Sequence, residues 1–381
     1  MRNTFSRLFM FIALSACVEG LNAHSIASPS DSSSSAGEVA WVVDRVRDYK
    51  TENDIPGVAI GVIKDGKPLL IQGFGVMQRG EPAPFNETSL IQIASVTKVM
   101  TGIVANRLIR ESVIDPKESI VKYLGDLLSP EAQARLEPVT IEHLLHHRAG
   151  VPRDSVTPVR VDHNSPMLDG YSEEAMVADL NVMELAFTPG SKWEYSNFGY
   201  DILGYIFERK TGRSFEKLIQ DYVAKPYGMK EVFIEPTERW TSRIATPYRK
   251  DDRRIETYAW VMGKQAPSGG VYTNIEGLLR LVGSQIQAYR SNAKTGTPSD
   301  LILTSRTAST EFGDPPMHYG YGLFQRATRY DHFGDLDGYG SDYRFSPELG
   351  LGVVAVTTSG GIWLDDMMDE IYADLLVQYS K

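Results

Sequence analysis

Apolar residues near both ends of the chain follow patterns that predict helices beside β-strands. In the N-terminal part, apolar residues recur at the three- and four-residue spacing of an amphipathic helix: Val39, Val42, Val43 and Val46. Residues 57–76 contain two β-rich runs around an Asp-Gly pair at 65–66, which is typical of a hairpin turn. Residues 343–358 predict two more strands joined at 346–348, and residues 362–379 predict a closing helix.

The middle of the chain lacks this strand pattern. Residues 96–110 carry apolar side chains on one helical side, and helices with loops continue to about residue 310 without an internal repeat. The predicted class is therefore α+β, with one antiparallel sheet built from both termini (about 38–94 and 318–381) and flanked by the first and last helices. A mainly helical lobe is inserted over about 95–317, and we expect a catalytic cleft where the lobe meets the sheet.

The N-terminal segment has the features of an export signal. Two arginines precede a short apolar run, which is too short to span a bilayer as a helix. The run ends in Leu-Ser-Ala-Cys at 14–17, which resembles a bacterial lipobox, so residues 1–17 are predicted to be a signal peptide with lipidation at Cys17. The alternative is an ordinary signal peptide cut near Ala23. Residues 18–37 are serine-rich and predict a tether, so the expected location is the periplasm or envelope, with membrane contact only through Cys17.

Composition narrows the function of the remaining residues, 38–381, which we expect to form one hydrolase domain. The chain is 42% hydrophobic and 23% charged, as is usual for a protein that buries a core. Its net charge of -10 and the lack of a basic run argue against a nucleic-acid partner. A single cysteine rules out an intrachain disulfide.

Ser95 and Lys98 are the first candidates for chemistry. The pattern Ser-x-x-Lys is weak alone, because it occurs four times: Ser95/Lys98, Ser119/Lys122, Ser214/Lys217 and Ser291/Lys294. Ser214 is in the position of a helix N-cap. Ser95 differs because it follows an apolar segment and begins a helix, whose dipole favours developing negative charge. Lys98 lies one turn further on the same helix face, and a lysine in apolar surroundings loses its proton more easily.

Tyr195 and Asn197 supply further polar groups. They lie between a Pro-Gly pair and a predicted helix, and functional groups are often carried by such loops. A tyrosine near a cation can transfer a proton, and an asparagine amide can orient lysine and substrate. A second Tyr-x-Asn at Tyr272 and Asn274 weakens the motif alone; Tyr272 suits either a cleft wall or the core.

Three short motifs in this order resemble those of the serine β-lactamase-like hydrolases, which include class C β-lactamases, DD-peptidases and related esterases. The motifs are IASVTK with Ser95 and Lys98, YSN with Tyr195 and Asn197, and HFG beginning at His332. The resemblance extends from about residue 40 to 378 and includes LLHHRAGVP, FTPGSKWEYSNFGYDILG, KPYGM and PSGGVYTN.

This resemblance implies an acyl-enzyme mechanism without a cofactor. Ser95 would attack an amide or ester carbonyl of a small acyl substrate: an ester, a D-amino peptide or a β-lactam. The backbone N–H groups of Ser95 and Asp335 would hold the oxyanion. Asn197, His332, Gly334 and Asp335 would bind or orient the substrate. Whether Lys98 or Tyr195 takes the serine proton is left open.

The third motif departs from true β-lactamases, which usually carry lysine at the place of His332. Histidine is a smaller, pH-dependent charge, so we expect weaker binding of a substrate carboxylate. Asp335 stands where a small or hydroxyl residue is usual, and its carboxylate is expected to repel an anionic substrate. These departures favour poorly anionic acyl compounds over β-lactams.

His143, His146 and His147 lie close together, but no zinc motif accompanies them, so no metal is predicted. Residues 318–324 predict a strand whose glycines allow close backbone approach.

The alternative function is a non-catalytic envelope protein that uses the same fold to bind peptidoglycan fragments or a partner.

Overall fold

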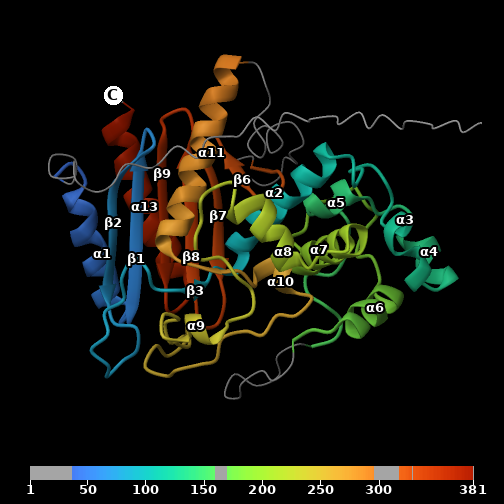
Figure 1. Cartoon of the computed structure of the whole chain (residues 1–381), viewed down its shortest axis with the longest axis horizontal. Helices are drawn as coiled ribbons and strands as arrows, with labels where there is room; N and C mark the ends of the chain where they lie inside the picture. Colours follow the sequence, from blue (N-terminus) through green and yellow to red (C-terminus); the bar gives the residue numbers. More distant parts are fainter. Residues whose placement is uncertain (1–36, 159–169, 296–316, 328, 381) are drawn as a thin grey trace, which may run out of the picture.

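The computed structural model describes residues 37–158, 170–295, 317–327 and 329–380, so the predicted signal peptide and almost all of the predicted tether lie outside it. In these residues the main sheet has seven antiparallel strands in the order β2-β1-β9-β8-β7-β6-β5 (Figure 1). The strands are β1 (Gly57–Lys64), β2 (Lys67–Gly75), β5 (His318–Tyr319), β6 (Phe324–Arg326), β7 (Arg329–Asp335), β8 (Gly340–Ser346) and β9 (Leu351–Thr357). Strands from the two ends of the chain pair at β1 and β9, which confirms the α+β prediction.

Helices cover both faces of this sheet (Figure 1). The predicted first and last helices are α1 (Ala40–Glu52) and α13 (Ile362–Tyr379), and their apolar side chains share one cluster with the strands. α11 (Ile275–Thr295) packs on β1, β8 and β9 from the opposite face. The lobe predicted over 95–317 therefore includes one helix that belongs to the sheet.

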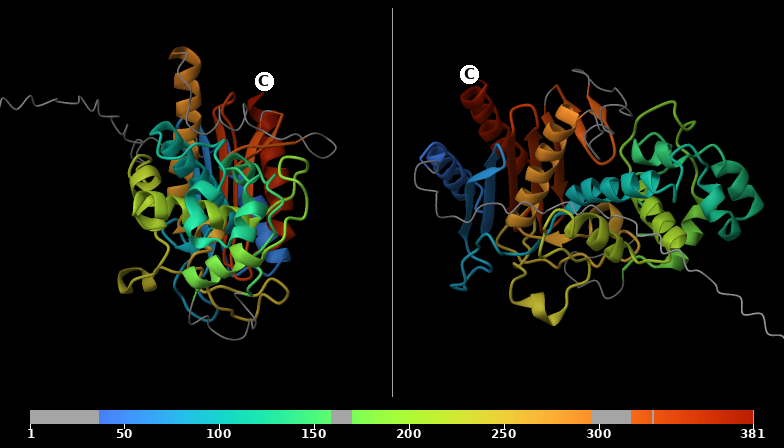
Figure 2. Two further views of the ribbon diagram at one scale, coloured as in Figure 1. Left: turned by 90° about the vertical axis from the view of Figure 1, so that its right-hand side faces the viewer. Right: turned by 45° about the horizontal axis from the view of Figure 1, so that its top comes forward.

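Most of the remaining helices lie in the lobe beside the sheet (Figure 2). The remaining helices are α2 (Thr97–Arg110), α3 (Val121–Leu124), α4 (Pro130–Leu136), α5 (Ile141–Leu145), α6 (Glu173–Val182), α7 (Asn197–Thr211), α8 (Phe215–Ile219), α9 (Glu238–Thr241) and α10 (Ala266–Gly269), with short 3₁₀ or π turns at η2 (Ala94–Val96), η3 (Gly125–Leu127) and η4 (Gln220–Ala224). A separate two-stranded ribbon pairs β3 (Ile91–Gln92) with β4 (Tyr272–Thr273). None of the helices in the described ranges is long and apolar enough to cross a membrane.

The prediction of one strand over 318–324 is wrong. A turn separates β5 from β6, because Gly322 adopts a φ of 82° that few other residues tolerate. The expected close approach is present: a Cβ on Gly322 would lie 2.1 Å from the carbonyl oxygen of Lys98. This turn therefore presses directly on the first turn of α2.

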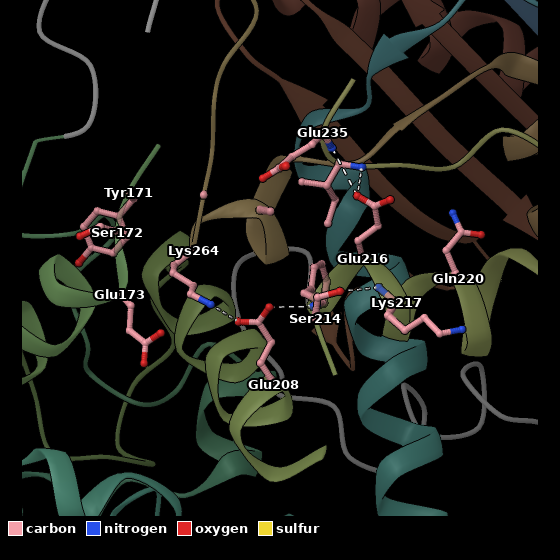
Figure 3. A pocket seen from close by; sticks show the side chains of 14 residues that line it. Tyr171, Ser172, Glu173, Glu208, Ser214, Glu216, Lys217, Gln220, Glu235 and Lys264 are labelled. Carbon is pink, nitrogen blue, oxygen red and sulfur yellow. Dashed lines mark hydrogen bonds and ion pairs between the residues drawn. The ribbon is translucent and has the colours of Figure 1, made fainter. Parts of the chain in front are cut away.

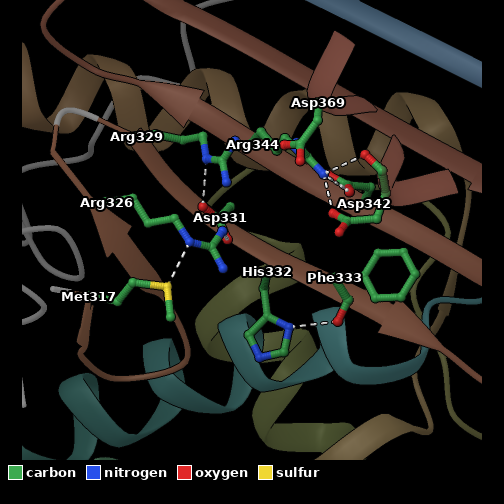
Figure 4. A network of polar contacts seen from close by, with 10 residues as sticks. Met317, Arg326, Arg329, Asp331, His332, Phe333, Asp342, Arg344 and Asp369 are labelled. Atoms are coloured by element: carbon green, nitrogen blue, oxygen red, sulfur yellow. Dashed lines mark hydrogen bonds and ion pairs between the residues drawn. The ribbon is translucent and has the colours of Figure 1, made fainter. Parts of the chain in front are cut away.

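A buried ion-pair network fixes β8 to α13 (Figure 4). The guanidinium of Arg344 is 2% exposed and binds both carboxylate oxygens of Asp342, at 2.7 and 2.8 Å. It also contacts Asp369 and Asp365 from α13. Since β7 pairs with β8 throughout its length, this network also supports the strand that carries the third motif.

Candidate active site

Ser95 lies in the tight turn between β3 and α2. Ala94 enters this turn with a φ of 48°, which is uncommon for a residue with a side chain and is typical of strained functional turns. The hydroxyl of Ser341 on β8 donates to the carbonyl of Ile93 at 2.6 Å. Gly334 on β7 packs so closely that a Cβ there would lie 2.5 Å from the same carbonyl oxygen. The third motif thus lies directly beside the proposed nucleophile.

Lys98 is completely buried, and three oxygen atoms surround its Nζ. Nζ donates to Oδ1 of Asn197 at 2.8 Å and to the carbonyl of Ser268 at 2.6 Å, and it lies 3.3 Å from Oγ of Ser95. Burial lowers the pKa of Lys98 to about 7. A large part of the Lys98 side chains is therefore uncharged at neutral pH.

The amide of Asn197 is held in one orientation. Its Nδ2 donates to a carboxylate oxygen of Asp154 at 2.8 Å, so its oxygen is the atom that faces Lys98. The backbone of Asn197 is also fixed, because its N–H donates to the carbonyl of Arg153 at 2.7 Å at the start of α7. Asp154 therefore acts on Lys98 through Asn197.

Tyr195 completes the group that the sequence predicts. It forms a hydrogen bond with Ser95, and the centre of its ring lies 5.0 Å from Nζ of Lys98. Burial raises the pKa of Tyr195 above its ordinary value, so the phenol keeps its proton at neutral pH. One half-buried site thus brings together Ser95, Lys98, Tyr195 and Asn197. Ser95 comes from the turn, Lys98 from α2, and Tyr195 and Asn197 from the start of α7.

His332 also reaches this site, but not as the cation that was expected. It is 2% exposed, and burial lowers its pKa to about 3. Its Nδ1 contacts the carbonyl of Phe333 at 2.9 Å, and its Nε2 contacts the hydroxyl of Tyr319 at 3.3 Å. A carbonyl can only accept, so Nδ1 carries the hydrogen and Nε2 accepts from Tyr319. His332 is therefore neutral, and both of its ring nitrogens have hydrogen-bond partners. The prediction of a pH-dependent charge at this position is wrong, because burial favours the neutral ring.

Asp335 does not present a free negative charge either. Its carboxylate forms an ion pair with Lys250 at 3.1 Å. Successive strand residues alternate between faces, so Asp335 shares a face with Phe333, which packs with the cluster under α13. Gly334 points the other way, toward residues 93–94 at the start of the turn that carries Ser95. The expected repulsion of an anionic substrate is therefore weakened by this pairing and by the direction of the side chain.

Three residues of the site were not singled out from the sequence: Asp154, Asp201 and Ser268. Asp201 had a detectable signal, since Asn197, Asp201 and Gly204 recur at the four- and three-residue spacing of one helix face. Asp154 and Ser268 had no such signal in the sequence. Asp154 belongs to a loop, and Ser268 contributes only its backbone carbonyl to the site.

Two of the competing motifs have structural roles. The hydroxyl of Ser214 caps α8 by accepting from the N–H of Lys217, as predicted. Tyr272 is 2% exposed and stacks on Phe233 in a small apolar cluster, which places it in the core, and Asn274 donates to Glu231 at 3.0 Å.

The histidines at 143, 146 and 147 also have other contacts. His143 closes a capping box with Thr140 at the start of α5, and His147 accepts from the N–H of Ser196 at 3.1 Å. Groups suited to hold a metal ion were not found in the described part of the chain.

A separate pocket of about 490 Å³ is lined by Glu208, Glu216 and Lys264, among other residues (Figure 3). Two of its carboxylates are already bound: Glu208 pairs with Lys264 at 2.6 Å, and Glu216 accepts from the backbone N–H of Ile234 at 3.1 Å. Ser95, Lys98 and Tyr195 do not line it, so it is distinct from the candidate site.

Comparison with known proteins identifies the family. The β-lactamase family model matches residues 42–377. This chain belongs to the β-lactamase family. The class of protein that this match supports is a β-lactamase-family serine hydrolase, as the three motifs predicted.

The relatives that match over most of this chain are distant. Protein flp of Staphylococcus aureus (strain MW2) is 24% identical over 84% of this chain, and the chain spans only 63% of that relative's length. Esterase EstB of Burkholderia gladioli is 30% identical over 58% of this chain and 57% of its own length.

Two solved structures share the β-lactamase/transpeptidase-like fold. A β-lactamase/D-alanine carboxypeptidase from Pseudomonas syringae aligns with a TM-score of 0.73 at 18% identity, covering 88% of this chain and 99% of its own. An octameric penicillin-binding protein homologue from Pyrococcus abyssi aligns with a TM-score of 0.71 at 23% identity, covering 90% of this chain and 78% of its own. At these identities the likeness establishes the fold.

Proposed function

We propose that this chain hydrolyses carboxylic esters of weakly anionic acyl compounds through an acyl-enzyme on Ser95. The observation that carries this proposal is the arrangement of acceptors around Lys98. A neutral amine has two hydrogens and one lone pair. Asn197 Oδ1 and the Ser268 carbonyl take the two hydrogens, so the lone pair is directed at the Ser95 hydroxyl. This favours Lys98 over Tyr195 as the base.

In the first step, Oγ of Ser95 bonds to the ester carbonyl carbon while its proton passes to Nζ of Lys98. The negative charge on the carbonyl oxygen is held by the backbone N–H groups of Ser95 and Asp335. The ammonium of Lys98 then returns the proton to the leaving alkoxide, and Tyr195, which retains its own proton, donates a hydrogen bond in this exchange. Water repeats the sequence on the acyl-enzyme and releases the acid.

The substrate class follows from the third motif. A penicillin carries a carboxylate, and a cation at the position of His332 would stabilise it. Here His332 is neutral, and both of its ring nitrogens have partners. The likeness to Esterase EstB points the same way. We therefore expect esters to be better substrates than penicillins.

The test measures hydrolysis of p-nitrophenyl butyrate and of a penicillin by the wild-type chain, Ser95→Ala and Ser214→Ala. Ser214 is the matched control, because it also precedes a lysine by three residues but caps α8. Ester hydrolysis should be lost in Ser95→Ala and kept in Ser214→Ala. Efficient penicillin hydrolysis at neutral pH would contradict the substrate class.

Fluorophosphonate labelling separates catalysis from the alternative, a non-catalytic envelope protein that binds peptidoglycan fragments or a partner. Label on the wild type and none on Ser95→Ala supports the hydrolase. Absence of label and of ester turnover from the folded wild type would favour the binding protein.

Export and lipid anchoring through Cys17 are part of the proposal, and they rest on residues outside the described range. If they hold, metabolic labelling with palmitate will mark the wild type, and Cys17→Ser will abolish the label and release the chain from membranes. A wild type without label would favour cleavage near Ala23.

A further inference from the structure

Asp201 is a buried acid that lies one helical turn beyond Asn197 on α7. It is 1% exposed. Its Oδ1 accepts a hydrogen bond from the backbone N–H of Ser268 at 3.1 Å, while its Oδ2 is buried without a hydrogen-bond partner. The three motifs do not include it, and the acyl-transfer steps above do not use it.

The Ser268 peptide links this acid to the proposed base. On one side its N–H donates to Asp201, and on the other side the carbonyl of Ser268 accepts from Lys98 at 2.6 Å. A second contact seats α10 on α7: a Cβ on Gly204 would lie 2.0 Å from Cγ of Pro267. Asp201 and Gly204 together therefore determine where the Ser268 carbonyl lies.

The surroundings of Asp201 do not support a negative charge. A buried carboxylate oxygen without a partner costs more free energy when it is ionised than when it carries a proton. Lys98 forms no ion pair with Asp201, since its hydrogens go to Asn197 and Ser268. Burial raises the pKa of Asp201 well above its ordinary value, against the effects of Ser268 and Lys98.

Other charged groups act on the same pair from the loop before α7. Arg153 lowers the pKa of Lys98 and Asp154 raises it, so these neighbours oppose one another. Asp154 also adds to the raised pKa of Asp201. The amine of Lys98 and the carboxyl group of Asp201 are thus separated by the Ser268 peptide.

We propose that Asp201 is a positioning residue that is held as a neutral carboxylic acid, and that it fixes the Ser268 peptide so that the lone pair of Lys98 faces Ser95. The inference rests on the proposed hydrolase function for its kinetic consequences. It does not rest on that function for the protonation state of Asp201.

The kinetic test compares Asp201→Asn with Asp201→Ala. Asparagine keeps the Oδ1 acceptor and is neutral, so kcat/KM for p-nitrophenyl butyrate should stay within about threefold, with the acid limb of its pH profile in place. Alanine removes the acceptor and leaves the Ser268 N–H unpaired, so kcat should fall by at least about tenfold with little change in KM.

Two kinetic results would overturn the proposal. If Asp201 is an anion, its charge raises the pKa of Lys98, and Asp201→Asn will move the acid limb to lower pH by about one unit or more. A folded Asp201→Ala with unchanged kcat would show that the Ser268 contact is not needed. Asp179→Asn is the matched control, because Asp179 on α6 is also buried but accepts hydrogen bonds from Tyr171 and Thr157 and has no contact with the Ser268 peptide.

A direct measurement needs no substrate. The carboxyl carbon of Asp201 in ¹³C-aspartate-labelled protein, assigned by its loss in Asp201→Asn, should have the chemical shift of a protonated acid at pH 7. The shift of an ionised carboxylate would refute the proposal and leave the hydrolase intact. Conversely, a protonated Asp201 in a wild type without ester turnover would contradict the hydrolase alone.

Discussion

Arg344 and Lys98 are two buried cationic side chains that the fold treats in opposite ways. Arg344 is 2% exposed and has carboxylates on both sides, from Asp342 on β8 and from Asp369 on α13. Lys98 is 0% exposed, and its direct partners are a hydroxyl, an amide and a backbone carbonyl. Their surroundings raise the pKa of Arg344 and lower that of Lys98 to about 7.

The difference separates a structural charge from a reactive group. An ion pair repays the cost of burial only when its partners are close and charged, and Arg344 has such partners. Lys98 has polar partners without full charge, so it reduces the cost of burial by losing its proton. The same loss makes it a base for Ser95.

The largest expected effect on activity comes from Lys98→Met. The variant keeps the length of the side chain and removes the base, so kcat/KM for p-nitrophenyl butyrate should fall by about 10² to 10⁴-fold. Thermal unfolding should show little loss of stability, because no ion pair is broken. Retained activity would assign the serine proton to another base, with Tyr195 the nearest candidate.

Arg344→Met should have the reverse profile. It leaves Asp342 buried without its cation, so the free energy of unfolding should decrease by about 3 to 5 kcal/mol in urea titrations. Below the unfolding transition, ester turnover should stay within about threefold of the wild type, since Arg344 does not contact Ser95. A stable but inactive variant would mean that the network acts on the chemistry.

The sequence was sufficient for the groups that lie close together along one helix. Ser95 and Lys98 were distinguished from three similar pairs by their apolar context, and the strands at both chain ends predicted the sheet. The neutral state of His332 was not predictable, because it depends on Tyr319 and on burial by the lobe. Ser268 was not predictable for a similar reason, because its contact with Asp201 exists only where α10 crosses α7.

A smaller loss should follow Asp154→Ala. Without this carboxylate the Asn197 amide is free to turn its nitrogen toward Lys98. An amide nitrogen cannot accept a hydrogen bond, so one hydrogen of Nζ would lose its acceptor. We expect kcat/KM to fall by about tenfold, comparable with the loss of one charged hydrogen bond. A larger fall in Asn197→Leu than in Asp154→Ala would show that Asp154 acts through Asn197, whereas a larger effect of Asp154→Ala would contradict this path.

Lys250→Gln should have the smallest effect. The ion pair between Lys250 and Asp335 is partly exposed, so its loss should change the free energy of unfolding by less than about 1 kcal/mol. Ester turnover should stay within about twofold, since Asp335 contributes its backbone N–H rather than its carboxylate. A strong decrease limited to anionic esters would show that the carboxylate reaches the cleft and repels them.

The central claim is that Lys98 is a neutral base at neutral pH, and its titration tests this most directly. The Nζ resonance of ¹⁵N-lysine-labelled protein, assigned by its loss in Lys98→Met, should titrate near pH 7, because burial lowers the pKa of Lys98 to about 7. Below that pH Lys98 carries a proton and cannot accept another, so kcat/KM should fall about tenfold per pH unit.

The same titration fixes the sign of a stability effect. The folded pKa lies below the unfolded value of 10.5, so the unfolded chain binds more protons between about pH 7 and 10.5. The contribution of Lys98 to stability therefore rises with pH through that window, and Lys98→Met should lack it. Agreement of the Nζ midpoint with the acid limb of kcat/KM, both near pH 7, is the result that this account predicts. A midpoint near 10.5 in an active enzyme would contradict it.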